Sequence, residues 1–328
     1  MNTTLKLNGN GISRIINSSV IQSPLAGVTD KIFRKFIRRW APNSLLFTEM
    51  INATSLNLGY GIEKINQISA EEGPIGIQLF DNRPFSVAEA AKESESSGAY
   101  LIDINMGCPV RKIARKGGGS ALLKDPKLAE ELVSRISKAV KIPVSVKTRL
   151  GWSSKDENIK DFLLRLQDAG ANMLTIHGRT REQGFNGKAD WEMIGNLKKE
   201  LEIPVIANGD IYSVNDAIKC LKETKADGIM IGRGVLGSPW IIGEIDAAIK
   251  GAAFKKPTLQ EKLCLIIEHL DELTSLKGSH GLLLARKHIA WTCKNFDGAN
   301  NLRKALVRAN TAEEVKEKIN LMISSLKN

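Results

Sequence analysis

Short apolar runs alternate with longer amphipathic stretches from about residue 20 to residue 250. Several runs are apolar on both faces, as parallel strands covered by helices are. One amphipathic stretch begins at Asp125-Pro126, where an aspartate suits the helix cap and a proline suits the first helical position. The eight runs that we predict to be strands cover residues 20–23, 45–47, 75–79, 100–104, 144–146, 173–176, 205–207 and 228–231.

Eight β-α units in this stretch predict a (β/α)8 TIM barrel, which typically needs ~250 residues. A doubly wound open sheet is the alternative, because strands are easily miscounted in a single sequence. After residue 250 the strand pattern stops, and Pro257-Thr258 begins a stretch with helical patterns only. We therefore predict an α/β barrel over residues 1–250 and a small all-helical domain over residues 251–328.

Polar residues follow nearly every predicted strand, which a purely structural barrel would not need. Barrel enzymes place their functional groups at the carboxyl ends of the strands. The candidates at these positions are Gln78, Asn105, Cys108, Lys147, Arg149, His177, Arg179, Asn208, Asp210 and Arg233. The sequence therefore predicts an active site at this end of the barrel.

The strongest single signal is a cysteine held in a loop after the fourth strand. Gly107 permits a sharp turn, and Pro109 keeps Cys108 extended. Arg111 and Lys112 place positive charge nearby, which would lower the pKa of the thiol. A nucleophile, a redox sensor and a proton donor all remain open from this motif alone. Asp103, within the strand, is expected to hold neighbouring backbone.

The loops after the last two strands fit a phosphate site. Barrels commonly bind phosphate there, on backbone N–H groups and a short helix. Gly209, Gly232 and Gly234 would let the backbone approach the phosphate, and Arg233 adds charge. The G-x-G-x-x-G pattern that ends at Gly237 also suggests a dinucleotide site, but that pattern normally follows the first strand of its fold. We favour the phosphate loop.

Lys147 interrupts a buried strand pattern, so its ammonium group must meet a negative group or reach the rim and solvent. A reduced flavin, which is negative near N1, would be one such partner. His177 is predicted to be functional because it ends a strand beside Arg179. Cys220, Cys264 and Cys293 lie in helical patterns and are expected in the core.

The net charge of +11 favours a polyanion such as nucleic acid, but it fits a lysine-rich solvated surface equally well. Four widely spaced cysteines without a CxxC pair indicate free thiols in a reducing cytoplasm, with no disulfide framework and no metal site. No apolar run has the 18 or so residues of a membrane span, and the first residues lack the pattern of a secretory signal. We expect a cytoplasmic protein without membrane contact.

Seven motifs follow one another along nearly the whole chain. They are Pro24-Leu25-Ala26-Gly27-Val28-Thr29-Asp30, Asp103-Ile104-Asn105-Met106-Gly107-Cys108-Pro109, Gly119-Ser120-Ala121-Leu122-Leu123, Lys147-Thr148-Arg149-Leu150-Gly151-Trp152, His177-Gly178-Arg179-Thr180-Arg181, Ala207-Asn208-Gly209-Asp210 and Gly232-Arg233. In this order and combination they resemble the tRNA-dihydrouridine synthase family. Arg286-Lys287-His288, with the helices after it, resembles the bacterial B-type subfamily, and Leu25 replaces a Met often found in the first motif.

The resemblance implies an FMN enzyme that reduces the C5–C6 double bond of specific uridines in tRNA, with NADPH or NADH as reductant. It implies that Cys108 is the general acid and that Asn105 and Arg149 hold the uracil edge, while Arg286 and Lys287 bind tRNA. The residues implied at the flavin ring are Pro24, Leu25, Ala26, Gln78 and Lys147. Those implied at the ribityl phosphate are His177, Asn208, Gly209, Asp210, Gly232 and Arg233.

Two other functions remain possible at this point. A flavin barrel that reduces a free pyrimidine would need no basic helical domain, and a non-catalytic RNA-binding barrel would contain no flavin. For the synthase, we expect the basic residues at 111–116 and the helical domain to grip tRNA on either side of an unstacked base. We expect the glycine-rich loop at 115–119 to close Cys108 over that base. A monomer without a protein partner is predicted.

Overall fold

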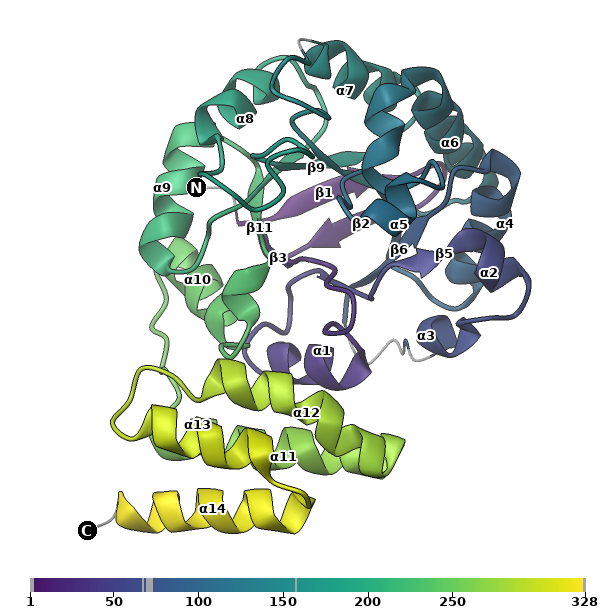
Figure 1. The fold of residues 1–328 in the computed structure, drawn as a ribbon. Helices are drawn as coiled ribbons and strands as arrows, with labels where there is room; N and C mark the ends of the chain where they lie inside the picture. The colour runs from purple at the N-terminus through teal and green to yellow at the C-terminus, as the bar shows by residue number, and fades with distance from the viewer. Residues whose placement is uncertain (1–2, 67, 69–72, 157, 327–328) are drawn as a thin grey trace.

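Eight parallel strands form a nearly closed barrel at the centre of the computed structural model, and helices surround it (Figure 1). The strands follow the order β3-β11-β10-β9-β8-β7-β6-β4, and the Gln22 N–H donates to the Leu45 carbonyl (3.1 Å) across the remaining gap. The predicted barrel is confirmed, and the doubly wound sheet is excluded. The strands are β3 Val20–Gln22, β4 Leu46–Phe47, β6 Ile75–Phe80, β7 Leu101–Asn105, β8 Val144–Arg149, β9 Met173–His177, β10 Val205–Asn208 and β11 Gly228–Ile231.

The structure describes residues 3–66, 68, 73–156 and 158–326, so the outermost residues of both predicted domains, 1–2 and 327–328, lie outside it. The predicted cap of α6 is confirmed, because the Asp125 side chain accepts a hydrogen bond from the Leu128 N–H (3.1 Å). The helices around the barrel are α1 Lys31–Arg38, α2 Ala53–Asn57, α3 Ile62–Asn66, α4 Pro84–Ser96, α5 Arg111–Ala114, α6 Pro126–Ala139, α7 Ile159–Asp168, α8 Trp191–Lys198, α9 Val214–Thr224 and α10 Ile241–Lys250.

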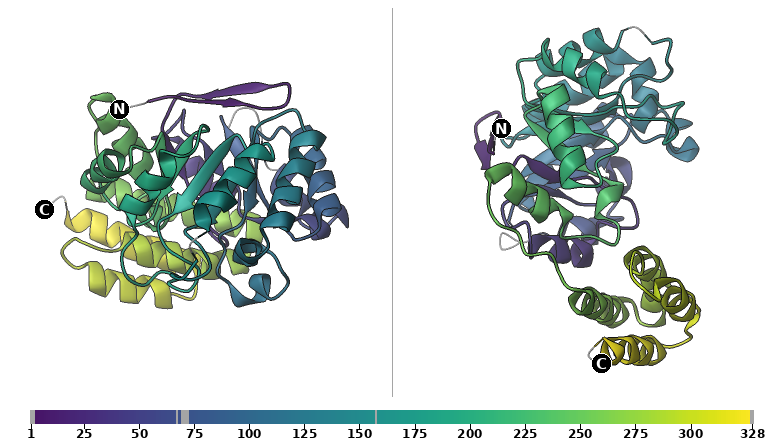
Figure 2. Two further views of the ribbon diagram at one scale, coloured as in Figure 1. Left: turned by 90° about the horizontal axis from the view of Figure 1, so that it is seen from above. Right: turned by 90° about the vertical axis from the view of Figure 1, so that its left-hand side faces the viewer.

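An antiparallel hairpin of β1 (Leu5–Asn8) and β2 (Ser13–Ile16) lies across the amino-terminal end of the barrel (Figure 2, left). Its buried leucines pack with Phe47 and other side chains of the barrel interior. The Ile12 N–H donates to the Lys141 carbonyl (3.1 Å), just before β8. The hairpin thus covers the end of the barrel opposite to the predicted site. One further short strand, β5 (Ile51–Asn52), pairs with β6.

Four helices after the barrel form a bundle beside α1 and α10 (Figures 1 and 2). The bundle begins with a capping box between Thr258 and Glu261, and its apolar core includes Ile32 and Phe36 of α1. The division at residue 250 stays a prediction. Within the described residues, no helix is long and apolar enough to cross a membrane. The bundle helices are α11 Leu259–Lys277, α12 Ser279–Thr292, α13 Ala299–Arg308 and α14 Ala312–Ser325.

Two histidines lie where the bundle meets the barrel. The ring centroids of His269 in α11 and His288 in α12 are 4.3 Å apart, and both rings face Phe33 of α1. Each side chain is only 8% exposed. Burial and the nearby Lys287 ammonium lower the pKa of His269 to about 4, while burial and His269 lower that of His288 to about 2. Both imidazoles are therefore neutral at neutral pH.

Lowering the pH from about 7 to about 5 is expected to destabilise the protein through this pair. Because both folded-state pKa values lie below the ordinary 6.5, the unfolded chain takes up protons first. The stability that depends on the neutral imidazoles is fully present above pH 6.5. It is lost as the pH falls towards about 4 for His269, at up to about 1.4 kcal/mol per pH unit for each histidine. Urea unfolding at both pH values measures the effect. A His269→Leu/His288→Leu variant should lose less stability on acidification, and an equal loss would contradict the prediction.

Candidate active site

A cavity of about 260 Å³ opens at the carboxyl-terminal end of the barrel, and every barrel strand or the loop after it contributes to its wall. Most of the predicted site residues line it; Arg286 and Lys287 do not. The predicted residues in the wall are Pro24, Leu25, Ala26, Gln78, Asn105, Cys108, Lys147, Arg149, His177, Asn208, Gly209, Asp210, Gly232 and Arg233. The fold therefore brings together side chains that are far apart in the sequence.

The loop that carries Cys108 is held from two sides. The Asn105 Oδ1 atom accepts hydrogen bonds from the Cys108 N–H (2.8 Å) and the Gly107 N–H (3.2 Å). The Arg149 Nε atom donates to the Gly107 carbonyl (2.7 Å), and its Nη1 donates to the carbonyls of Thr180 and Gly184. Asn105 and Arg149, which were predicted to hold the substrate, thus also shape the loop beside it.

The Cys108 thiol is a protonated group in this environment. Burial raises its pKa above the ordinary 9.0, and this effect exceeds those of the Val110 N–H and the Arg149 and Lys147 charges, which favour the thiolate. The sequence-based expectation that Arg111 and Lys112 lower this pKa is wrong, because both side chains are exposed on α5 and the nearby cations come from β8. A thiol with a raised pKa suits a proton donor better than a nucleophile.

Asp103 lies behind the cavity wall and is fully buried. Its Oδ1 accepts a hydrogen bond from the Ser145 hydroxyl (2.6 Å), and its Oδ2 accepts one from Gln78 Nε2 (2.6 Å). Burial raises its pKa to about 7, against the opposing effects of these two hydrogen bonds and of Lys147. The expectation that Asp103 holds backbone is therefore wrong, since its partners are side chains.

Lys147 lies inside the barrel rather than at its solvent-exposed rim. Its Nζ atom donates to Asn208 Oδ1 (2.9 Å) and lines the cavity. Burial and the nearby Arg149 lower its pKa to about 8, while Asp103 acts in the opposite direction. At neutral pH the ammonium is therefore mostly charged, and it is available to a negative group in the cavity.

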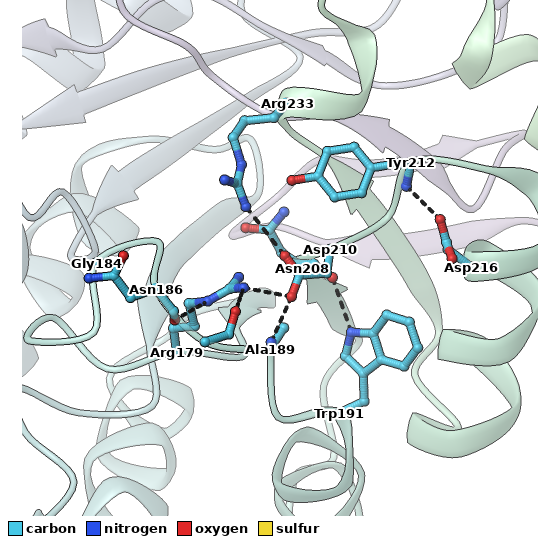
Figure 3. Close-up of polar contacts among 12 residues, drawn as sticks. Arg179, Gly184, Asn186, Ala189, Trp191, Asn208, Asp210, Tyr212, Asp216 and Arg233 are labelled. Carbon is cyan, nitrogen blue, oxygen red and sulfur yellow. Dashed lines mark hydrogen bonds and ion pairs between the residues drawn. The ribbon is translucent and has the colours of Figure 1, made fainter.

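Asp210, in the cavity wall, holds two arginines, Arg179 and Arg233 (Figure 3). Its Oδ2 accepts hydrogen bonds from Arg179 Nη2 (2.6 Å) and the Ala189 N–H (2.8 Å), and its Oδ1 accepts one from Arg233 Nη2 (3.3 Å). The arginine contacts hold the pKa of Asp210 below its usual value despite its partial burial. Because the carboxylate is already engaged, Asp210 would offer only its backbone to a phosphate.

His177 lies near several cationic side chains, and the backbone at Gly232 has free space beside it. Burial, together with the charges of Lys147, Arg149, Arg179 and Arg233, lowers the pKa of His177 to about 2, so the imidazole is neutral. Its buried Nδ1 atom has no hydrogen-bond partner within the described structure. A Cβ atom added at Gly232 would meet only Ser23 Cβ, at 3.9 Å. These features leave a polar, positively charged space that an anion would fill.

The cavity wall also contains two aromatic residues that were not predicted. Phe185 and Tyr212 are exposed at the cavity wall, and the Arg233 guanidinium lies 4.8 and 5.6 Å from their ring centroids. An aromatic residue in a polar, glycine-containing loop was the only available signal for them.

Three other residues that the sequence singled out lie outside the cavity. Arg286 donates to the Ala309 carbonyl (3.2 Å), and Lys287 donates to the Gly27 carbonyl. Cys264 is exposed, so its predicted core position is wrong.

Comparison with known proteins places close relatives over nearly the whole chain. The family model described as dihydrouridine synthase (Dus) matches residues 21–328. A Synechocystis protein named probable tRNA-dihydrouridine synthase 1 is 52% identical over 316 residues, which cover 96% of this chain and 89% of the relative. The tRNA-dihydrouridine synthase B of Xanthomonas campestris is 37% identical over 302 residues, which cover 91% and 90% of the two chains.

Solved structures with similar folds have much lower sequence identity. Morphinone reductase matches with a TM-score of 0.54 and 13% identity, over 80% of this chain and 94% of the reductase. Histamine dehydrogenase from Rhizobium matches with a TM-score of 0.58 and 13% identity, over 82% of this chain and 50% of the dehydrogenase. At this identity the similarity shows the barrel fold alone.

Proposed function

Because this chain belongs to the dihydrouridine synthase family, we propose that its cavity binds FMN and that Cys108 supplies the proton for uridine reduction. The protein is a tRNA-dihydrouridine synthase, an oxidoreductase that works with NAD(P)H and a flavin. Membership in this family excludes the two alternative functions, a free-pyrimidine reductase and a non-catalytic RNA-binding protein. The observation that carries the proposal is that one cavity contains both the protonated thiol and the cationic, glycine-lined side.

The residues present fit FMN. The unpartnered His177 Nδ1, the open backbone at Gly232 and the Arg233 charge suit a phosphate, while Pro24–Ala26 offer an apolar surface to a flat ring. The Lys147 ammonium would face the negative edge of the ring, beside Gln78. Bound FMN, reduced by NADPH, would supply the hydride that the reaction requires.

Cys108 would hold a proton at Sγ and give it to C5 of the uracil ring. The raised pKa keeps that proton on the thiol at neutral pH, as a general acid requires. Asn105 and Arg149 would orient the uracil edge, because both line the cavity next to Cys108. Their bonds to the loop backbone would keep the thiol and the base in one fixed geometry.

The target uridine must leave its stack to enter the cavity, so the tRNA must be held outside it. The helical bundle, including Arg286 and Lys287, and the exposed basic segment at 111–116 would provide this grip through phosphate contacts. The loop at 115–119 would close Cys108 over the base when tRNA is bound. Protection of this loop from proteolysis by tRNA would support the closure, and unchanged cleavage would contradict it.

The FMN assignment predicts a difference between two flavins in an Arg233→Ala variant. Loss of a charge-assisted hydrogen bond to phosphate, worth ~1.5–3 kcal/mol, should weaken FMN binding roughly 10–100-fold. Riboflavin has no phosphate, so its affinity should change little. Flavin titration of the stripped protein measures both constants. Arg165→Ala is the matched control, since Arg165 pairs with Glu130 on the outer helices. Equal weakening of both flavins would exclude a phosphate contact.

A further inference from the structure

A chain of side-chain hydrogen bonds leads from Asp103 to the loop of Cys108. Asp103 Oδ2 accepts from Gln78 Nε2 (2.6 Å), and Gln78 Oε1 accepts from Asn105 Nδ2 (2.8 Å). Asn105 Oδ1 then accepts from the Cys108 N–H (2.8 Å). Asp103, Gln78 and Asn105 are all buried, and β6 and β7 pair Gln78 directly with Asp103. The backbone of the sheet therefore fixes the positions of the three side chains.

The orientation of both amide groups follows from what each partner can donate or accept. Oδ2 of Asp103 accepts a hydrogen bond, so Gln78 presents its NH₂ group to Asp103 and its oxygen to Asn105. Asn105 must then present its NH₂ group to Gln78, which leaves its oxygen for the backbone N–H groups of the loop. Reversal of either amide would place donors against donors at a buried site, which is costly.

The geometry points to Asp103 as a positioning residue for uridine reduction, because it holds the loop of Cys108 in place through Gln78 and Asn105. This inference rests on the proposed role of Cys108 as proton donor. Asp103 itself is not among the described residues that line the cavity, so it acts through the two amides. Ser145 fixes the other carboxylate oxygen. A proton on that oxygen would leave Oδ2 free to accept from Gln78, so the chain of bonds survives protonation of Asp103.

Two substitutions at Asp103 test this role. In Asp103→Leu no acceptor remains for Gln78, so the loop should loosen and the Cys108 thiol should become less buried. We expect several-fold faster alkylation of Cys108 by iodoacetamide at about pH 8 and a kcat for dihydrouridine formation that is about 10–100-fold lower, with KM for tRNA changed less than about threefold. In Asp103→Asn the new oxygen still accepts from Gln78 while the new NH₂ donates to Ser145, so both readouts should stay near those of the unmodified protein.

The experiment uses the full-length holoenzyme with Cys264→Ser, because Cys264 is exposed and would also be alkylated. Ser145→Ala is the matched control. It removes the hydrogen bond to Asp103 Oδ1 but leaves every bond between Asp103 and the loop. Its alkylation rate should therefore match that of the parent protein. Alkylation as fast as in Asp103→Leu would show that general loosening of the buried site, and not the chain of bonds, controls the loop.

A pair of substitutions that exchanges the carboxylate of Asp103 with the amide of Gln78 tests the same chain of bonds where Asp103→Leu does not fold. Gln78→Glu alone places two carboxylates face to face and should speed alkylation of Cys108. Combined with Asp103→Asn, the introduced amide can donate to the introduced carboxylate, which can still accept from Asn105, so slow alkylation should return. Failure of the double variant to restore it, or unchanged alkylation in Asp103→Leu, overturns the proposal. Alkylation does not require turnover, so it reports on the position of the loop even if Cys108 is not the proton donor. A failure of the proposed function is therefore distinguishable from a failure of this inference.

Discussion

Replacement of Cys108 by alanine is expected to reduce dihydrouridine formation by about 100-fold or more, while the protein keeps its flavin. The thiol is the protonated group held over the cavity, and alanine has no proton to give. The residues that would contact the flavin come from other strands, so binding of the cofactor should not change. The measurement combines the flavin absorbance of the purified variant, its reduction by NADPH and its yield of dihydrouridine in tRNA.

Cys264→Ser serves as the control for the loss of a thiol, because Cys264 is exposed on α11, outside the cavity. It should retain full activity. Cys108→Ser adds a graded comparison, since a hydroxyl has the right position but a far weaker acidity, and it should be impaired as well. Full activity in Cys108→Ala would exclude the proton-donor role, whatever the outcome for the other variants.

Gly237→Ala is expected to have the largest effect on stability, about 3 kcal/mol or more. Gly237 has a φ of +75°, and an added Cβ would lie 2.1 Å from the Trp291 carbonyl oxygen of α12. Both the backbone strain and the clash act where the bundle packs on the barrel. The free energy of unfolding in urea measures the loss, and tRNA binding should weaken as the bundle is displaced.

Gly251→Ala separates these two causes. Gly251 has a similar φ of +68°, but an added Cβ there would find no atom within 4 Å. The free energy of unfolding of this variant should fall only by the cost of the backbone strain, on the order of 1 kcal/mol. Similar losses in both glycine variants would show that the clash with the Trp291 carbonyl adds nothing to the cost of the backbone strain.

The barrel could be predicted because its strands are apolar on both faces, a pattern that needs no knowledge of their neighbours. Parallel topology then brought the strand ends together, which predicted Cys108, Lys147 and Arg233 at one site. The hairpin at the amino end escaped prediction. Leu5-Lys6-Leu7-Asn8 alternates over only four residues, and its apolar face is buried by the barrel interior rather than by its own partner strand.

Other misses have equally local reasons. A helical pattern placed Cys264 in a helix but did not fix the side on which it lies, and it is exposed. Phe185 lies in a loop without periodicity, and its position depends on how Arg179 holds that loop through the carbonyls of Asn186 and Gly187. The partners of Asp103 could not be read either, because a strand buried on both faces does not show which way a polar side chain points.

The hairpin across the amino end also bears on the order in which the chain can fold during synthesis. Leu5, Leu7 and Ile16 are made before their barrel partners, which extend as far along the chain as Met230. Their apolar side chains therefore cannot be buried in the barrel until most of the barrel has been translated. The segment that leaves the ribosome before the barrel can reach its native packing only after its last barrel partner has been made.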